Sequence, residues 1–257
     1  MHMDKPTTHT PCWVELGTSD PEAAKRFYAA VFGWRAATDP RPEAGGYTIL
    51  HLGESTADAP VAALMGLMGE GQPTAWSIAF SVTDADAAVA AVRKAGGSLI
   101  VDPMDVFEEG RYAVVADPSG AAFALWQPRA FDGFTSYEAN GGMCWAELHT
   151  DDTAGAERFY PAVFGWTVRR SVDFYAMFSL GEADFGGLAG IDEEHTPGAR
   201  PHWLPYFGVE DVDAAVERAA AAGGRAVMGP VQVPDGPYIA VVSDPQGAVF
   251  GLLRGAA

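Results

Sequence analysis

Residues 12–34 read CWVELGTSDPEAAKRFYAAVFGW, and residues 144–166 read CWAELHTDDTAGAERFYPAVFGW. The two stretches agree at most positions and lie 132 residues apart. A second stretch, from Trp76 to Phe123, returns from Trp203 to Phe250 at a separation of 127 residues. Long segments that recur in the same order indicate an internal duplication. The chain therefore contains one domain written twice, and loops between the blocks absorb a net deletion of five residues.

Each copy alternates between strand-like and helix-like runs. In the first copy, Asp20 is typical of a helix N-cap, Pro21 of the first helical position and Gly33 of a helix end. The expected elements are a strand at 12–18, a helix at 20–33, strands at 47–52, 61–68 and 77–82, a helix at 85–95, and strands at 98–101, 112–116 and 121–126. We therefore predict an α+β fold in which a strand–helix–strand–strand–strand module occurs twice per copy. The predicted boundaries are an N-terminal tail at 1–11, a first domain at 12–127, a linker at 128–142 and a second domain at 143–257.

Composition excludes several classes of partner. The 257 residues carry a formal net charge of −18, which provides no excess of cations for nucleic acid or an anionic membrane. Cys12 and Cys144 occupy equivalent positions in the repeat, so we expect apolar strand residues rather than a disulfide. The first residues lack the apolar core of a signal peptide, and no apolar run approaches the length of a membrane span. We expect a cytoplasmic protein.

Two motifs recur in both copies and point to a family. They are Phe27-Tyr28 with Phe32-Gly33-Trp34, and the later turn Asp117-Pro118-Ser119-Gly120, which returns as Asp244-Pro245-Gln246-Gly247. This combination resembles the vicinal oxygen chelate superfamily, which includes glyoxalase I, extradiol dioxygenases, fosfomycin-resistance proteins and bleomycin-binding proteins. The tandem arrangement is similar to two-domain actinobacterial members, among them accessory proteins of anthracycline biosynthesis. The resemblance implies four βαβββ modules that form open, barrel-like clefts, and we expect the two copies to face each other across a cleft for small molecules.

Most enzymes of this superfamily use a divalent metal ion held by His, Gln and Glu side chains. When the superfamily's ligand positions are carried onto this sequence, they fall on Trp13, Ser77, Ala124 and Ala63 in the first copy and on Trp145, Leu204, Gly251 and Gly187 in the second. Only Ser77 carries a side-chain oxygen, and a neutral hydroxyl is a poor ligand for such an ion. We therefore predict neither a metal nor another cofactor, and no glyoxalase I chemistry. Glu147 and His149 could form a displaced metal site, but two ligands make a weak one.

Strand alternation predicts which side chains enter the cleft. Trp13 and Glu15 share one face, and Trp145, Glu147 and His149 share the equivalent face. We predict Glu147, His149 and Glu15 as catalytic residues, because a carboxyl group in an apolar cleft has a raised pKa and can transfer a proton. The predicted ligand-binding residues are Trp13, Trp145, Ser77, Trp126, Tyr206 and Arg111.

Each of these residues also has a purely structural interpretation. Glu15 and Glu147 could bond backbone amides or an arginine, and their presence in both copies favours a role in the scaffold. His149 replaces Gly17 of the first copy and could simply end a strand. Arg111 has no clear counterpart, because Pro237 occupies its place, and a loop arginine is often a solvated rim residue. The remaining interpretations are a core role for Trp76 and Trp203 and incidental positions for His51 and His202.

We predict that the protein binds a bulky, partly aromatic small molecule, as a metal-independent enzyme or accessory protein of secondary metabolism. Two alternatives stay open: a non-catalytic binding or antibiotic-sequestering protein, and a metal-dependent lyase or dioxygenase with relocated ligands. Single-copy relatives assemble their sites from two chains, so we expect this tandem chain to be a monomer or a weak homodimer.

Overall fold

The computed structural model describes residues 6–53, 59–69, 71–134, 140–172, 174–191 and 198–254. Each copy forms one eight-stranded sheet with two α-helices, so the α+β prediction is confirmed. The first copy contains β1 (Pro11–Thr18), α1 (Pro21–Phe32), β2 (Arg35–Thr38), the 3₁₀ turn η1 (Pro42–Ala44), β3 (Thr48–His51), β4 (Pro60–Gly66), β5 (Ala75–Ser81), α2 (Ala85–Lys94), β6 (Ser98–Val106), β7 (Gly110–Ala116) and β8 (Ala122–Pro128). The second contains β9 (Met143–Thr150), α3 (Thr153–Phe164), β10 (Thr167–Val172), β11 (Tyr175–Leu180), β12 (Ala183–Gly190), β13 (His202–Gly208), α4 (Val212–Ala221), β14 (Arg225–Gln232), β15 (Tyr238–Ser243) and β16 (Val249–Arg254).

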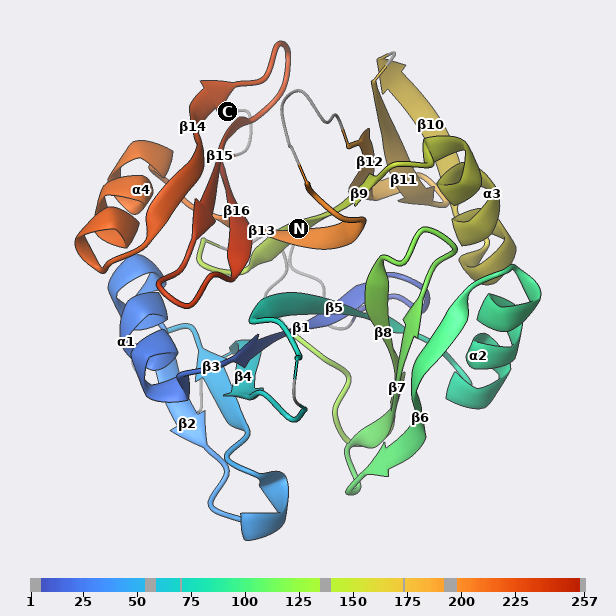
Figure 1. Ribbon diagram of the computed structural model, residues 1–257, viewed down its shortest axis with the longest axis horizontal. Helices are drawn as coiled ribbons and strands as arrows, with labels where there is room; N and C mark the ends of the chain where they lie inside the picture. Colours follow the sequence, from blue (N-terminus) through green and yellow to red (C-terminus); the bar gives the residue numbers. More distant parts are fainter. Residues whose placement is uncertain are drawn as a thin grey trace.

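The two sheets share one strand order. It is β2-β3-β4-β1-β5-β8-β7-β6 in the first copy and β10-β11-β12-β9-β13-β16-β15-β14 in the second. Each βαβββ module supplies half of a sheet, and β1 joins the halves by pairing with both β4 and β5. Both sheets curve without closing into a barrel (Figure 1). The prediction of four modules is therefore confirmed, although the sequence interpretation omitted β2, whose short and mostly exposed Arg-Ala-Ala-Thr run shows no alternation.

The first helix forms as its local sequence predicts. The Asp20 side chain accepts a hydrogen bond from the backbone N–H of Ala23, which satisfies an otherwise free donor at the helix start. Gly33 ends α1 with a φ of 75°, a left-handed conformation that favours glycine. In the second copy, Asp152 and Gly165 cap α3 in the same way. Between these caps, each helix turns its buried Phe-Tyr pair toward the core.

The two copies pack back to back rather than face to face. Figure 1 shows the two curved sheets with their open sides pointing away from each other, and the helices lie in pairs, α1 beside α4 and α2 beside α3. Strands β5 and β13 meet at the centre of this interface. The expectation of a shared cleft between the copies is therefore wrong. Its physical reason is that the large apolar side chains project from the convex sides, which must be buried against each other.

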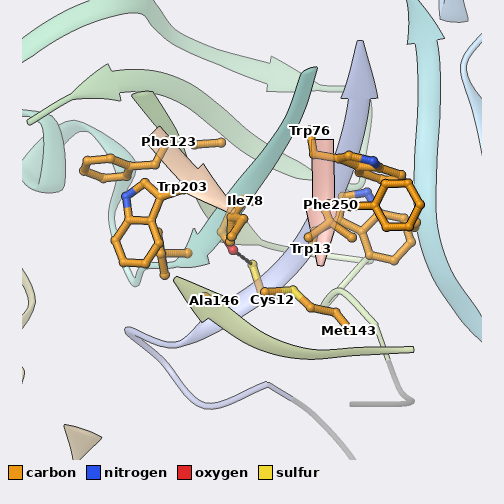
Figure 2. Packing of buried hydrophobic residues seen from close by; sticks show 14 of the residues in the cluster. Cys12, Trp13, Trp76, Ile78, Phe123, Met143, Ala146, Trp203 and Phe250 are labelled. Atoms are coloured by element: carbon orange, nitrogen blue, oxygen red, sulfur yellow. Dashed lines mark hydrogen bonds between the residues drawn. The ribbon is translucent and has the colours of Figure 1, made fainter. Parts of the chain in front are cut away.

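A reciprocal set of hydrogen bonds ties the two copies together. Tyr28 Oη donates to Asp244 Oδ2 of the other copy at 3.0 Å and accepts from Trp76 Nε1 at 3.0 Å. The equivalent set joins Tyr160 to Asp117 at 3.0 Å and Trp203 to Tyr160 at 3.1 Å. Figure 2 shows the two halves of this core, with Trp76 and Phe250 on one side and Trp203 and Phe123 on the other. The two recurring motifs are thus interface partners of each other, and the predicted core role of Trp76 and Trp203 is confirmed.

Cys12 and Cys144 form no disulfide in the part of the chain that the structure describes. Cys12 is buried, and its Sγ donates to the carbonyl oxygen of Ala79 at 3.3 Å (Figure 2). Within the described ranges, no helix has both the length and the apolar character needed to cross a bilayer.

Candidate functional site

Strand β9 carries the centre of the candidate site. Its residues Ala146 and Leu148 are fully buried on the convex side of the sheet, so Trp145, Glu147 and His149 project from the concave side. Strand β13 runs antiparallel to β9, and directly opposed residues of such a pair share a face. The residues opposite these three, in the same order, are Tyr206, Leu204 and His202.

Glu147 is the charged group at the centre of this face. It accepts hydrogen bonds from Tyr175 Oη at 2.8 Å and from Tyr206 Oη at 3.1 Å. His149 Nε2 lies 2.8 Å from Glu147 Oε1, an ion-pair distance without hydrogen-bond geometry. Burial by itself raises the pKa of Glu147, but His149 and the two tyrosines together hold it below its usual value. The raised pKa expected for this residue is therefore wrong, and the carboxyl group is anionic at neutral pH.

A chain of hydrogen bonds from a tryptophan through a tyrosine to a glutamate exists in both copies. In the second copy, Trp145 Nε1 donates to Tyr175 Oη at 2.9 Å, and Tyr175 donates to the carboxylate. In the first copy, Trp13 Nε1 donates to Tyr47 Oη at 3.0 Å, and Tyr47 donates to Glu15 Oε1. The tryptophan and glutamate predicted for each cleft are thus linked through a tyrosine that the sequence interpretation missed.

The two carboxyl groups differ in their electrostatic surroundings. Burial raises the pKa of Glu15, and the hydrogen bond from Tyr47 opposes this only in part. Gly17 stands on β1 where His149 stands on β9, so Glu15 has no imidazole two residues along its strand. The second copy therefore holds a carboxyl group with a lowered pKa beside a histidine, whereas the first holds a carboxyl group with a raised pKa.

His202 belongs to the candidate face and is not incidental. Its ring stacks on that of His149 with centroids 5.0 Å apart and planes 5° apart. Its Nδ1 lies 2.8 Å from the carbonyl oxygen of Arg200, and because a carbonyl only accepts, this nitrogen carries the proton. Burial lowers the pKa of His202, so its neutral form is favoured at neutral pH. A neutral ring therefore covers one side of the His149 imidazole.

Tyrosine side chains occupy the space at two of the four second-copy positions that the resemblance assigns to metal ligands, Gly187 and Gly251. A Cβ added at Gly187 would lie 1.9 Å from Tyr175 Oη, and one added at Gly251 would lie 2.1 Å from the Tyr206 ring. Donor side chains are absent there, and the space that they would occupy is taken. Among the described residues, no group of three or more His, Cys, Asp or Glu side chains could hold a metal ion. The residues present therefore do not fit the superfamily's metal.

The other predicted ligand-binding residues separate into two groups. Ser77 lies beside Glu15 on the neighbouring strand, on the concave face of the first sheet. Trp126 lies on the same face, where its ring covers Gly110 and its Nε1 donates to the carbonyl of Phe131 at 2.9 Å. Both residues thus belong to the first copy's face rather than to that of Glu147.

Arg111 lies outside both faces. Its guanidinium forms ion pairs with Asp86 at 2.8 Å and with Asp105 at 2.9 Å at the protein surface. The strand register shows that the counterpart of Arg111 is Tyr238 and not Pro237. Both side chains donate a hydrogen bond to a helix: Arg111 to Asp86 of α2, and Tyr238 Oη to Asp213 of α4. Arg111 therefore attaches its strand to a helix, and we leave it out of the proposed site.

An apolar wall completes the concave face of the second copy. On β15 and β16, Ala240, Val242, Phe250 and Leu252 are fully buried against the helix side. Among the residues that alternate with them, four apolar ones are only partly buried: Ile239, Val241, Val249 and Leu253. Met228 and Val231, on the adjacent edge strand β14, are 38% and 43% exposed. Half-buried apolar side chains that share a face with a few polar groups are typical of small-molecule sites.

Sequence reasoning missed Tyr47, Tyr175 and the role of His202. The two tyrosines are separated by 128 residues, a value between the two repeat offsets, so neither block aligns them. Tyr47 directly precedes β3, and Tyr175 is the first residue of β11. These strands lie two places away from β1 and β9 in the sheets, and the sequence does not show this order directly. A search for equivalent aromatic residues in the variable region between the two blocks would have found them.

Both halves of the chain match one family. The Glyoxalase/Bleomycin resistance protein/Dioxygenase superfamily matches residues 11–125 and 142–252, and the chain therefore belongs to this superfamily. CFP32 from Mycobacterium tuberculosis, provisionally named a glyoxylase, is 38% identical over 250 residues, which cover 95% of this chain and 94% of the relative. The anthracycline biosynthesis protein DauV from Streptomyces sp. strain C5 is 37% identical over 255 residues, which cover 95% and 92%. These relatives confirm the resemblance found from the sequence motifs.

Solved structures share the fold at low identity. The Mn(II)-bound glyoxalase from Novosphingobium aromaticivorans is similar with a TM-score of 0.67 and 18% identity, covering 96% of this chain and 82% of that one. The 2,3-dioxygenase LapB from Pseudomonas sp. KL28 has a TM-score of 0.67 and 14% identity, covering 98% and 94%. At such identities the likeness establishes the fold alone.

Replacing each glutamate by glutamine is expected to give opposite pH profiles of stability. The pKa of Glu147 is lowered in the folded protein, so its stabilisation exists above the unfolded-state value and is lost as pH falls through the folded value. Glu147→Gln should therefore lower the free energy of unfolding by about 1–3 kcal/mol at neutral pH and by less in acid. The pKa of Glu15 is raised, so its stabilisation exists in acid and is lost as pH rises, and Glu15→Gln should cost least at neutral pH.

Urea unfolding of both variants and the parent between about pH 4 and pH 8 measures these profiles. The two variants are matched controls for each other, because the glutamates occupy equivalent strand positions. Parallel profiles for the two variants would contradict the assigned charge states.

Proposed function

We propose that the concave face of the second copy binds a planar, largely apolar aromatic molecule and that Glu147 and His149 transfer a proton on it. The single observation that carries this proposal is the geometry of the buried Glu147 carboxyl group, which accepts hydrogen bonds from two tyrosine hydroxyls and lies at ion-pair distance from His149. A carboxylate beside an imidazole stabilises the imidazolium that forms when the ring accepts a proton. The first copy, which has Gly17 in place of the histidine, serves as scaffold.

Each residue has a distinct role in this reaction. His149 accepts a proton from an acidic O–H or C–H group of the ligand and returns it to another atom of the same ligand. Glu147 stabilises the charged imidazole, while Tyr175 and Tyr206 keep the carboxylate oriented. The neutral His202 ring prevents His149 from turning away. The step is a proton relocation that needs neither an oxidant nor a reductant.

The expected ligand class follows from the surfaces around this pair. Trp145 is only partly buried, and the apolar wall of β14, β15 and β16 shares its face. A partly exposed indole and an apolar wall favour a flat ring system. The relatives named for anthracycline biosynthesis support a polycyclic aromatic ketone, whose phenolic and carbonyl groups could meet Glu147 and His149.

Binding of an anthracyclinone, the tetracyclic part of an anthracycline, tests the proposal. We expect the chromophore's fluorescence to change on titration and the affinity to fall by about tenfold in Trp145→Ala, since one aromatic contact contributes about 0.5–1.5 kcal/mol beyond its buried area. Mass spectrometry and chromatography of the recovered ligand then separate two functions. A rearranged product supports catalysis, whereas tight binding with unaltered ligand would instead support the sequestering function. Absence of binding at millimolar ligand would contradict the proposed ligand class.

A further inference from the structure

The segment that follows β8 lies across the concave face of the first sheet. We call residues 129–134 the strap. Phe131 packs against Trp13 with ring centroids 4.8 Å apart and planes 87° apart, and its ring centroid lies 6.2 Å from that of Trp126. Phe134 lies 6.3 Å from Trp13 and is almost fully buried. Figure 1 shows this yellow-green segment running between the central strands and the far end of β7. The strap therefore fills the space that faces the Trp13 indole.

Backbone contacts hold the strap in place. The N–H groups of Arg129 and Phe131 donate to the carbonyl of Glu109 at 3.0 and 3.1 Å. The N–H of Phe134 donates to the carbonyl of Cys12 at 2.9 Å. Gly133 adopts a φ of 116°, and a Cβ there would lie 2.1 Å from the Cys12 oxygen, so only glycine fits. These contacts make the strap a fixed part of the first copy.

The rim of the first sheet is bridged as well. Arg41, at the start of η1, lies over the Phe107 ring at 4.1 Å from its centroid, so the β2–β3 connection touches the β6–β7 turn. In the second copy β10 ends at Val172 and β11 begins at Tyr175, and Pro234 stands at the position equivalent to Phe107. The equivalent bridge therefore has neither the long connection nor the aromatic ring.

The Trp145 indole of the second copy occupies the position equivalent to Trp13, but no counterpart of Phe131 packs against it in the described part of the chain. Trp145 is partly exposed, whereas Trp13 is 4% exposed. Both indoles donate to an equivalent tyrosine and so have equivalent positions on their sheets. Among the described residues, no ring packs on Trp145 as Phe131 packs on Trp13. Within the described residues, the two copies thus carry one kind of ring-binding position, which Phe131 fills in the first copy and no ring fills in the second.

We infer that Phe131 is an internal ligand of the first copy, and that the equivalent space against Trp145 binds an aromatic ring of an external ligand, edge to face. This rests on the proposed function for the choice of an aromatic ligand, and it adds the position and orientation of the ring. It also assigns the first copy a latent site that the chain itself occupies. Phe131 on Trp13 is then the geometric template for the ligand on Trp145.

Phenol is a suitable probe, because it is one aromatic ring and its binding requires no catalysis. In calorimetric titrations we expect about one equivalent bound by the parent and about two by Phe131→Ala, since an apolar cavity lined by aromatic groups accepts a small ring. Trp145→Ala should bind none, and Phe131→Ala combined with Trp145→Ala should bind about one. Phe131→Leu, which keeps an apolar side chain in place, should behave like the parent.

Equal phenol stoichiometry for folded Phe131→Ala and the parent would overturn the inference. If that variant does not fold, as judged by circular dichroism, a crystal of the parent soaked with phenol provides the test. A ring lying perpendicular to Trp145 supports the inference, and phenol bound elsewhere on the protein contradicts it. These outcomes do not depend on proton transfer, so a failure of the proposed catalysis leaves them interpretable.

Discussion

Replacing His149 by glycine is expected to lower turnover of an anthracyclinone substrate by about 10²–10⁴-fold, the range that a positioned acid or base contributes. The lowered pKa values of Glu147 and His202 make both groups weaker bases than the free side chains, and His149 is therefore the described residue of this face that we assign as the base. Glycine is the residue that the first copy carries at this strand position. Exogenous imidazole should restore part of the rate in this variant, which separates lost chemistry from lost folding.

Matched variants define what the result means. Glu147→Gln removes the charge that stabilises the imidazolium but keeps a similar shape, so kcat should fall while KM changes little. Glu15→Gln, on the sheet that faces the opposite way, should leave kcat within about twofold of the parent. Conversion rates are measured by chromatography of the product at saturating substrate. Unchanged turnover in both His149→Gly and Glu147→Gln would remove the proposed catalytic pair.

Gly251→Ala is expected to destabilise the protein strongly for such a small change. The added Cβ would lie 2.1 Å from the Tyr206 ring, which must move and thereby lose its 3.1 Å hydrogen bond to Glu147. Overpacking of this kind costs about 1–3 kcal/mol. In the first copy, Ala79 and Ala124 pair across the strands at the positions equivalent to Tyr206 and Gly251. The same backbone therefore accommodates either two alanines or a tyrosine opposite a glycine.

Gly251→Ala should stabilise the protein, rather than destabilise it, when Tyr206 has already been replaced by alanine. In Tyr206→Ala, the ring that Gly251 accommodates is gone, and Gly251→Ala should stabilise by up to about 1 kcal/mol, because alanine loses less backbone entropy in a strand. Urea unfolding of the parent, both single variants and the double variant gives the coupling energy between the two positions, expected to lie between about 1 and 4 kcal/mol. Ala124→Gly in the first copy is the control and should cost only about 0.5–1 kcal/mol. An equal cost of Gly251→Ala in both backgrounds would show that Tyr206 does not press on this glycine.

Local patterns in the sequence were sufficient for much of the fold. The caps at Asp20 and Gly33 define α1, because capping depends on residues within one turn of the helix end. Alternation along β1 and β9 placed the tryptophans and glutamates on one face, since successive side chains of a strand point to opposite sides. Where the local signal was weak, as in the exposed four-residue β2, the prediction failed.

The sequence by itself thus determined the duplication, the modules and the faces of the central strands, because each depends on residues close together in the chain or on a repeat that can be read directly. Only the tertiary structure decided that the copies pack back to back, that His149, Tyr175 and Tyr206 together lower the pKa of Glu147, and that Phe131 fills the face of Trp13. These depend on contacts between strands and loops whose separation along the chain follows no period. The two copies share one strand order. The side chains on the two concave faces differ, and they make the face of the second copy the candidate site.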